Sequence, residues 1–394
     1  MTKSEYMQAL QKKMEKFNRE LQTEIVEDYE QHFAEGLAAG RTEDEIIEEL
    51  GNIEDMISEL PEKDIKQEIS VPQGADTGKD TYAASYNAVV IDGLVADVRV
   101  QDSTDGKITV EYHNEGDEAQ KKLYMFYQYE DNGVLHLGVK RNDNAVYTRR
   151  AKRAVKVMLL GRSYEFNLGN GMDGNDSEIS LVVGIPVGMP KVEVSTGSGN
   201  LEVESINVVR LNAHTRSGEM LIRDVKAEWM DVKTGSGDLE GVQLTADELR
   251  IQTGSGDLNI SKIKAGSMAC QTGSGDIDVN EISGRKVVVQ CGSGDIELDG
   301  DFEEYIVRTG SGDVEMRVGS RAKAVVVETG SGDMDIDLGK VKDPSIKAHT
   351  GSGECYVYSV DGTRKKVPSR YTVGNGECQV EIHTGSGDAE VRCY

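Results

Sequence analysis

The chain has 394 residues, enough for two or three domains of about 100 to 200 residues each. With 70 acidic and 44 basic side chains its formal charge is −26, which excludes a general nucleic-acid binder because such proteins are net basic. The 44 glycines, 6 prolines and 5% aromatic residues indicate many turns and few rings in the core. The first residues lack the apolar stretch of a signal peptide, and no run approaches 18 apolar residues. We therefore expect a cytoplasmic protein, or one peripheral at the cell envelope, without a transmembrane segment.

Residues 1–61 are predicted to form a small all-α domain. Apolar side chains recur every three or four positions, which is the period of amphipathic helices. Thr42 and Glu45 form a capping box at the start of a third helix over residues 43–50. A fourth short helix is expected before Pro61, which closes the domain.

Within this domain the sequence carries a family resemblance. The segment from Ile25 to Gly36, followed by Gly40 and by Thr42-Glu43-Asp44-Glu45-Ile46-Ile47, resembles the HAAS family of bacterial helical signalling domains. That family usually precedes membrane helices or another envelope-associated module. The resemblance implies that the domain contacts a protein partner in signalling, although membrane helices are missing here.

The dominant feature of the sequence is a repeat of Thr-Gly-Ser-Gly-Asp or a close variant. The copies are 18 to 23 residues apart until a final interval of 11, and begin at Thr196, Thr215, Thr234, Thr253, Thr272, Cys291, Thr309, Thr329, Thr350, Val373 and Thr384. A fixed period near 20 residues is typical of a solenoid whose coils stack. Counting from the threonine, apolar side chains alternate at +5 and +7 and again at −4 and −2, which predicts two short strands with one inward face. The predicted fold class is therefore mostly β: a parallel β-solenoid of about 19-residue coils over residues 196–394, with a C-terminal cap, preceded by the all-α domain.

The turn itself invites several interpretations. Its second glycine is present in all copies, which predicts a positive backbone torsion there. Its aspartates are expected to accept hydrogen bonds from free amides of the glycine turn. Calcium between coils is the alternative, although calcium β-rolls use a different, nine-residue repeat. The aspartates of this column are Asp238, Asp257, Asp276, Asp295, Asp313 and Asp333.

Chemistry beyond binding finds little support in the sequence. The turn serines have no histidine at an activating spacing, and His214 lies too far from His349 for one metal site. We therefore expect no enzyme activity, no metal site and no cofactor. Five cysteines, an odd number, fit reduced thiols, with a stacked disulfide between Cys355 and Cys378 as the alternative.

The segments ahead of the repeat have their own character. Residues 62–80 are expected to be a linker, and residues 81–195 a β-rich segment that leads into the solenoid and covers its first coil. Eight of the 15 tyrosines lie between Tyr82 and Tyr164, so an aromatic recognition surface is expected there. The same segment holds a basic island, whose candidate contact residues are Arg149, Arg150, Lys152, Arg153 and Lys156. Three interpretations stay open for it: contact with anionic lipid, contact with the protein's own acidic surfaces, and a plain loop.

The solenoid carries a second resemblance. From Val89 onward, and most clearly in Glu178-Ile179-Ser180-Leu181 and in Lys191-Val192-Glu193-Val194-Ser195-Thr196-Gly197-Ser198-Gly199, the chain resembles the putative-adhesin β-solenoid family of bacterial domains of unknown function. A HAAS-like domain ahead of such a solenoid is similar to LiaX-type proteins of Gram-positive bacteria. That resemblance implies a role in sensing envelope stress and antimicrobial peptides.

The leading hypothesis is a non-enzymatic scaffold or sensor at the bacterial cell envelope, with a helical signalling module and a rigid solenoid as binding platform. Its expected partners are a protein at the helical module and, at the solenoid, anionic lipid or a cationic peptide, but no nucleic acid. A cationic peptide would meet the outward acids at position +6, which are Glu202, Glu240, Asp278, Glu297, Glu315 and Asp335. The alternatives are a cytosolic self-assembling structural solenoid and a carbohydrate-binding or carbohydrate-processing β-helix.

Overall fold

A computed structural model of the chain divides into two compact units, Met1–Ser70 and Val71–Tyr394. The structure describes residues 2–14, 25–26, 29, 32–33, 41–50, 53, 77–142, 154–159, 162–167, 178–342, 344–359, 361–368, 370–373 and 376–393.

The first unit is helical. Among its described residues, α1 covers Lys3–Met14 and α3 covers Glu43–Leu50, and residues 25–26, 29, 32–33 and 53 are also helical. The predicted capping box is confirmed, since the Thr42 N–H donates to Glu45 Oε2 at 2.8 Å and the Glu45 N–H donates to Thr42 Oγ1 at 3.3 Å. The expected fourth helix lies outside the described residues apart from Ile53. The apolar sides of these helices meet in one small core formed by Tyr6, Met7, Leu10, Phe33, Ile46 and Ile53.

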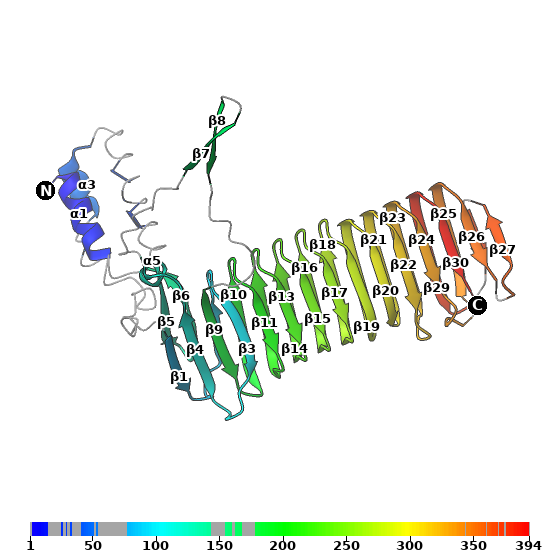
Figure 1. Cartoon of the computed structure of the whole chain (residues 1–394), viewed down its shortest axis with the longest axis horizontal. Coiled ribbons are helices and arrows are strands. Elements are labelled where there is room, and N and C mark those ends of the chain that lie inside the picture. Colours follow the sequence, from blue (N-terminus) through cyan, green and yellow to red (C-terminus); the bar gives the residue numbers. More distant parts are fainter. Residues whose placement is uncertain are drawn as a thin grey trace. The chain divides into compact units, whose positions relative to one another are not determined.

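The second unit is a parallel β-solenoid, as the repeat predicted. Each coil has one strand that runs into the glycine turn and one that leaves it, and each strand pairs in parallel with its equivalent in the next coil. We call the layer of incoming strands the A layer and the layer of outgoing strands the B layer. In Figure 1 the coils follow one another in chain order from cyan through green to yellow.

The strands fall into the two layers as follows. The A layer contains β2 (Ala88–Asp92), β10 (Met189–Thr196), β12 (Val208–Thr215), β14 (Lys226–Thr234), β16 (Thr245–Thr253), β18 (Lys264–Thr272), the second half of β19 (Ile277–Ser293), β21 (Glu304–Ser311), β23 (Ala324–Ser331), β25 (Pro344–Ser352) and β29 (Cys378–Ser386). The B layer contains β3 (Asp97–Asp102), β11 (Leu201–Glu204), β13 (Met220–Arg223), β15 (Leu239–Val242), β17 (Leu258–Ser261), the first half of β19, β20 (Ile296–Asp301), β22 (Val314–Val318), β24 (Met334–Asp337), β26 (Cys355–Tyr358) and β30 (Ala389–Arg392).

The apolar side chains that the alternation predicted to point inward do fill the interior of each coil. In one coil Leu258, Ile260, Ile263, Met268 and Cys270 are all at most 1% exposed. Burying side chains of this size stabilises the fold by about 1.5–3 kcal/mol each, and stacking the coils makes that burial continuous.

A buried column of threonines lines the glycine turns. The sequence analysis did not predict that these side chains bond to the turn backbone. Thr253 Oγ1 donates to the carbonyl oxygen of Gly237 in the preceding coil at 3.3 Å and accepts from the Gly256 N–H of its own turn at 3.0 Å. Thr272 repeats both bonds. The threonine therefore satisfies two polar backbone groups that would otherwise be buried without partners. Its presence at the first position of nearly every copy was the available signal.

The second glycine of the turn has a different role from the one predicted. A positive torsion is confined to the later coils, at Gly312, Gly332, Gly353 and Gly387. In the earlier coils the requirement is close approach, since a Cβ on Gly256 would lie 2.1 Å from the carbonyl oxygen of Gly237. The prediction of a positive torsion is therefore wrong for those coils, and the neighbouring backbone excludes a side chain instead.

The opposite edge of the coil bends at a left-handed residue that is not glycine. Five successive coils place such a residue nine positions after the threonine, with φ between 50° and 59°: Ser205, Asp224, Gln243, Lys262 and Glu281. Three positions after the last four of these residues, Ala227, Ala246, Ala265 and Gly284 already lie inside strands.

Replacing Lys262 by glycine is expected to stabilise the protein by about 1 kcal/mol, because only glycine adopts left-handed torsions without a Cβ clash. The matched control is Lys264→Gly, which is in the same coil and also exposed but lies outside the left-handed region, and which should destabilise the protein by about 0.5–1 kcal/mol. Urea unfolding followed by circular dichroism measures both changes. Equal losses in the two variants would contradict the prediction.

Antiparallel strands cover the first coil. β6 (Val134–Arg141) and β9 (Ile179–Ile185) extend the two layers in parallel beyond β2 and β3. β5 (Tyr124–Asp131), which follows the short helix α5 (Glu118–Leu123), pairs antiparallel with β6, and β4 (Ile108–Asn114) with β9. β1 (Thr77–Tyr82) pairs with β4 and begins inside the range expected to be a linker. A separate hairpin consists of β7 (Ala154–Leu159) and β8 (Arg162–Asn167).

At the other end the coils leave chain order. β23 pairs with β29 rather than with β25, and β25 pairs with the far side of β29. In the B layer, β30 likewise lies between β24 and β26. Figure 1 shows these red strands among orange ones. The coil that begins at Thr384 is thus inserted between the coils of Thr329 and Thr350, and the short antiparallel strands β27 (Arg364–Val367) and β28 (Arg370–Val373) follow on the last coil.

The insertion also decides the position of the cysteines. Cys378 is in register with Pro344, whereas Cys355 is in register with Ala389, so the proposed stacking of the two thiols is wrong. All five cysteines are unpaired. Burial raises the pKa of Cys270 to about 12 and that of Cys355 to about 11, so both thiols are protonated at neutral pH.

Candidate functional site

Of the five contact residues expected in the basic island, the structure describes only Lys156. Arg149, Arg150, Lys152 and Arg153 lie outside the described residues. Lys156 belongs to β7, where its backbone is in register with Glu165 of β8. The island therefore stays a prediction, and the outer faces of the solenoid are the surfaces on which a site can be built from described side chains.

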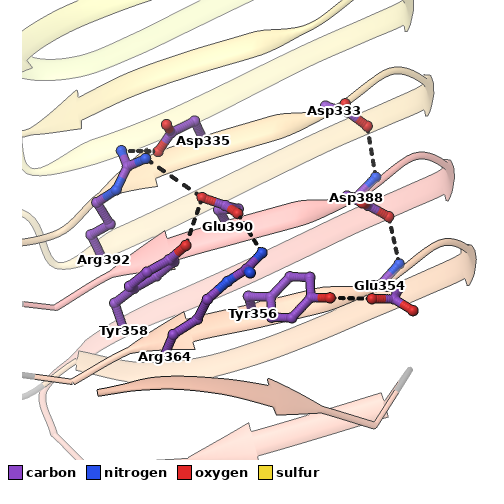
Figure 2. Close-up of polar contacts among 9 residues, drawn as sticks. All are labelled: Asp333, Asp335, Glu354, Tyr356, Tyr358, Arg364, Asp388, Glu390 and Arg392. Carbon is purple, nitrogen blue, oxygen red and sulfur yellow. Dashed lines mark hydrogen bonds and ion pairs between the residues drawn. The ribbon is translucent and has the colours of Figure 1, made fainter. Parts of the chain in front are cut away.

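The aspartate column along the turns is a hydrogen-bonded ladder. The Asp257 N–H donates to Asp238 Oδ1 at 2.9 Å, and each later coil repeats the bond. The ladder follows the inserted coil, since the Asp388 N–H donates to Asp333 Oδ1 at 2.8 Å and the Glu354 N–H to Asp388 Oδ1 at 2.7 Å (Figure 2).

This ladder modifies the expectation drawn from the sequence. The carboxylates do accept backbone amides, but the donor is the corresponding residue of the next coil and not a glycine of the same turn. Asn200 Oδ1 accepts from the Glu219 N–H at 3.0 Å in the same way, so an asparagine serves as well as an aspartate. One oxygen of each bonded carboxylate is therefore committed to joining coils.

The outward acids at position +6 do not form a uniform acidic face. Arg99 Nε lies 3.0 Å from Glu202 Oε2, Arg317 Nη2 lies 2.9 Å from Glu315 Oε1, and Arg392 pairs with Asp335. Glu240 and Asp278 make no ion pair with a described residue. The acidic surface open to a cationic ligand is therefore restricted to the middle coils.

Histidines come together in one place that chain order did not predict. His349 and His383 are in register on β25 and β29, with ring centroids 6.0 Å apart. The inserted coil brings them together. Within the part of the chain that the structure describes, no group of three or more His, Cys, Asp or Glu side chains is arranged to hold a metal ion. In the same part, no helix is long and apolar enough to cross a membrane.

The last coils carry a hydrogen-bonded group of outward polar and aromatic side chains, most of them partly exposed. We call this group the C-terminal cluster; it comprises Asp335, Glu354, Tyr356, Tyr358, Arg364, Lys366, Glu390 and Arg392. It spans β24, β30, β26 and β27, so it joins the inserted coil to the strands on both sides.

Glu390 on the inserted strand is the centre of the C-terminal cluster (Figure 2). It accepts from the Tyr358 hydroxyl at 3.1 Å and from Arg364 Nη2 at 3.0 Å, and Arg392 Nη2 lies 3.6 Å away. The Arg364 guanidinium stacks 3.6 Å from the centre of the Tyr356 ring. Tyrosine and arginine are the side chains that protein interfaces favour at their energetic centres, so this cluster is a candidate contact surface.

Hydrogen bonding shifts the titration of this cluster. The bond from Lys366 lowers the pKa of the Glu354 carboxyl, and the bond to Glu354 raises the pKa of the Tyr356 hydroxyl. The carboxylate therefore stays ionised and the phenol neutral over a wide pH range.

A second aromatic surface lies at the other end of the solenoid, within the tyrosine-rich segment that the sequence singled out. Tyr129 of β5 stacks on His136 of β6 with centroids 4.4 Å apart and an interplanar angle of 5°. Tyr127 stacks beside Tyr129 at 6.1 Å, and Lys140 Nζ lies 5.8 Å from the Tyr127 ring. Burial lowers the pKa of His136, so this stack is neutral at neutral pH.

These features define a parallel β-solenoid with capped ends and a helical domain ahead of it. The chain belongs to the Toastrack DUF4097 family, whose model matches residues 86–261 and 230–392. A HAAS domain occupies residues 5–59. The two solenoid matches overlap, as expected when repeated coils are alike.

The solved structures that are similar to the chain include the following two. One is described as a "putative adhesin" from Bacteroides fragilis NCTC 9343; it is 14% identical, with a TM-score of 0.33, and the match covers 80% of this chain and 96% of that one. The other is described as a "putative cell adhesion protein" from Clostridium sporogenes ATCC 15579; it is 11% identical, with a TM-score of 0.19, and the match covers 81% and 100%. No curated protein matches the chain.

Proposed function

We propose that this protein is a non-enzymatic binding scaffold associated with the bacterial cell envelope, with the HAAS domain as its signalling module. The observation that carries the proposal is the construction of the solenoid. Its interior is filled by apolar side chains, and its turns are bonded from coil to coil through threonine and aspartate. Ligands therefore meet a long, rigid outer surface on which side chains from many coils are held in register.

The C-terminal cluster supports a protein partner for the solenoid. Arginine and tyrosine side chains are already held there by hydrogen bonds and stacking, so little conformational entropy would be lost on binding. The acidic middle coils, with Glu240 and Asp278, offer a weaker attraction for a cationic antimicrobial peptide. The order of a HAAS domain and a solenoid, which resembles that of LiaX-type proteins, supports a place in the envelope-stress response.

The alternative of a self-assembling rod is less well supported. Antiparallel strands flank the coils at both ends, with β4 and β5 at one end and β27 and β28 at the other. Such strands interrupt the parallel register that end-to-end stacking would need.

Co-sedimentation with lipid vesicles tests the envelope association. We expect the full-length protein to bind phosphatidylglycerol vesicles at low salt, to be released at high salt and to ignore neutral vesicles, because each basic residue near an anionic surface contributes about 1 kcal/mol. Changing Arg149, Arg150, Lys152 and Arg153 to glutamate should abolish sedimentation. A matched variant with Arg99, Arg210, Arg250 and Arg285 changed to glutamate alters the net charge equally and should retain it.

Two results would contradict the lipid contact. If wild type and variant both stay in the supernatant, the basic island does not bind membranes, and the envelope association must come from a protein partner of the HAAS domain. If both reversal variants lose binding equally, total charge and not the island controls it.

A further inference from the structure

The inserted coil, residues 378–392, occupies a place whose walls both precede it in the chain. β23 and β24 form one wall, and β25 and β26 form the other. We call this place the slot. By contrast, each coil from Thr215 to Thr329 stacks directly on the coil that precedes it in the chain. The slot is therefore complete before the coil that fills it has been made.

The chain reaches the slot by crossing the last coil. β28 pairs with one edge of β25, and β29 pairs with the opposite edge. Four residues, 374–377, connect Val373 at the end of β28 to Cys378 at the start of β29. Short connections of this kind favour the exchange of an element between copies of a protein.

The slot and the coil each leave a defect when they are apart. Val380, Ile382, Ala389 and Val391 are 0% exposed in the slot and would meet water outside it. The strands of both walls would lose the pairing that β29 and β30 supply. The coil of a second copy would repair both defects equally, because it has the same side chains and the same backbone groups. Protein concentration then decides which copy's coil fills the slot.

Outward charges make the slot specific for this coil. At the first wall Arg392 pairs with Asp335 of β24, and at the second wall Lys347 Nζ of β25 lies 3.0 Å from Glu381 Oε1. The neighbouring coil places Val326 at the position of Glu381, so it could not pair with Lys347.

Glu390 strengthens the second wall and is balanced at the first. It accepts from Tyr358 and Arg364, which belong to the last coil and the strand beyond it (Figure 2). It is also in register with Asp335, a like charge, but Arg392 pairs with Asp335 and lies 3.6 Å from Glu390. Opposite charges therefore join the coil to both walls, and the occupant that fits them is the same coil of another copy.

We propose that two copies of this chain exchange the inserted coil, so that each copy fills the slot of the other. Each copy donates one coil and accepts one, so the product is a closed pair with two-fold symmetry. Growth stops at the pair because both slots are then filled, unlike the growth of an end-to-end rod. The exchange goes beyond the proposed scaffold function and does not depend on it.

Isotope mixing tests the exchange in the full-length wild-type protein. Unlabelled and isotopically labelled protein are concentrated together, and the dimer is isolated by size-exclusion chromatography. A carbodiimide then joins ion-paired carboxylates and amines as amides, and mass spectrometry identifies the linked peptides. About half of the links between Lys347 and Glu381 should join a labelled to an unlabelled chain, as random pairing of copies requires. Lys323 and Glu303, which are 2.7 Å apart on successive coils, should be linked only within one chain.

Charge reversal tests the recognition. A slot variant combines Asp335→Arg with Lys347→Glu, and a coil variant combines Glu381→Lys with Arg392→Asp, so neither changes the net charge. Each variant alone has mismatched walls, whereas the reversed coil of one fits the reversed slot of the other. The mixture should form dimers about tenfold more readily than either variant alone, because each mixed dimer restores four exposed ion pairs.

The matched control mixes Glu303→Lys with Lys323→Glu, whose reversed charges lie between successive coils. Exchange of the inserted coil cannot restore that pair, so this mixture should gain no dimer. An equal gain there would overturn the proposal, because general charge attraction would then explain the dimers. So would a wild-type protein without dimers up to its solubility limit, or a dimer whose Lys347–Glu381 links stay within one chain. Circular dichroism checks the folding of each variant, and the wild-type isotope experiment decides if a variant does not fold.

Discussion

Replacing Gly256 by alanine is expected to destabilise the solenoid by about 3 kcal/mol or more. The new Cβ would lie 2.1 Å from the carbonyl oxygen of Gly237 and 2.5 Å from its carbonyl carbon, so the backbones of two coils would have to separate. Separation would lengthen the threonine bonds that join the same coils, because Thr253 Oγ1 donates to Gly237 and accepts from Gly256. Urea denaturation followed by circular dichroism measures the loss.

Gly78→Ala is the matched control, since a Cβ on Gly78 would meet no atom within 4 Å and its backbone torsion is not positive. We expect the free energy of unfolding of this variant to stay within about 0.5 kcal/mol of the wild-type value, the usual range for an open surface position. A Gly256→Ala variant as stable as Gly78→Ala would show that the coils can separate at no cost, and the close-approach explanation would be wrong.

Deleting residues 376–394 is expected to have the second large effect, because it removes the inserted coil and not the end of the stack. β29 pairs with strands on both sides, and so does β30. Val380, Ile382, Ala389 and Val391 are fully buried, and the deletion exposes the core surfaces they cover. The truncated protein would display unpaired strand edges on β23, β24, β25 and β26, and such edges promote association.

Size-exclusion chromatography should therefore show concentration-dependent oligomers of the truncated protein, and its thermal unfolding should begin earlier. Adding a synthetic peptide of residues 376–394 should restore the wild-type elution volume by filling the gap. The matched control, Glu390→Gln, weakens the centre of the C-terminal cluster without opening the gap, so it should elute as wild type does. A truncated chain that elutes and melts like wild type would disprove the inserted position of this coil.

The candidate sites were predictable from the sequence only in part. The concentration of tyrosines between Tyr82 and Tyr164 led to the Tyr127–Tyr129–His136 stack, because composition alone showed where rings gather. The C-terminal cluster was missed because its parts come from coils that chain order separates.

The local sequence pattern is enough to define a single coil. A period near 19 residues with inward positions at −4, −2, +5 and +7 leaves one arrangement that buries the apolar side chains, and a shift by one residue would expose all of them. The same local logic predicted the capping box of Thr42 and Glu45, which depends on residues three positions apart.

The order in which the coils stack, by contrast, depends on contacts between distant parts of the chain. All coils present similar strands and the same glycine turn, so the hydrogen-bonding edges of the Thr329, Thr350 and Thr384 copies are interchangeable in the local pattern. The choice depends on the length of the connections and on contacts such as those of Glu390, which form only after the coil has been inserted. For the same reason the role of the second glycine was misjudged: a residue's own torsion is a local property, whereas the carbonyl that excludes a Cβ at Gly256 belongs to another coil.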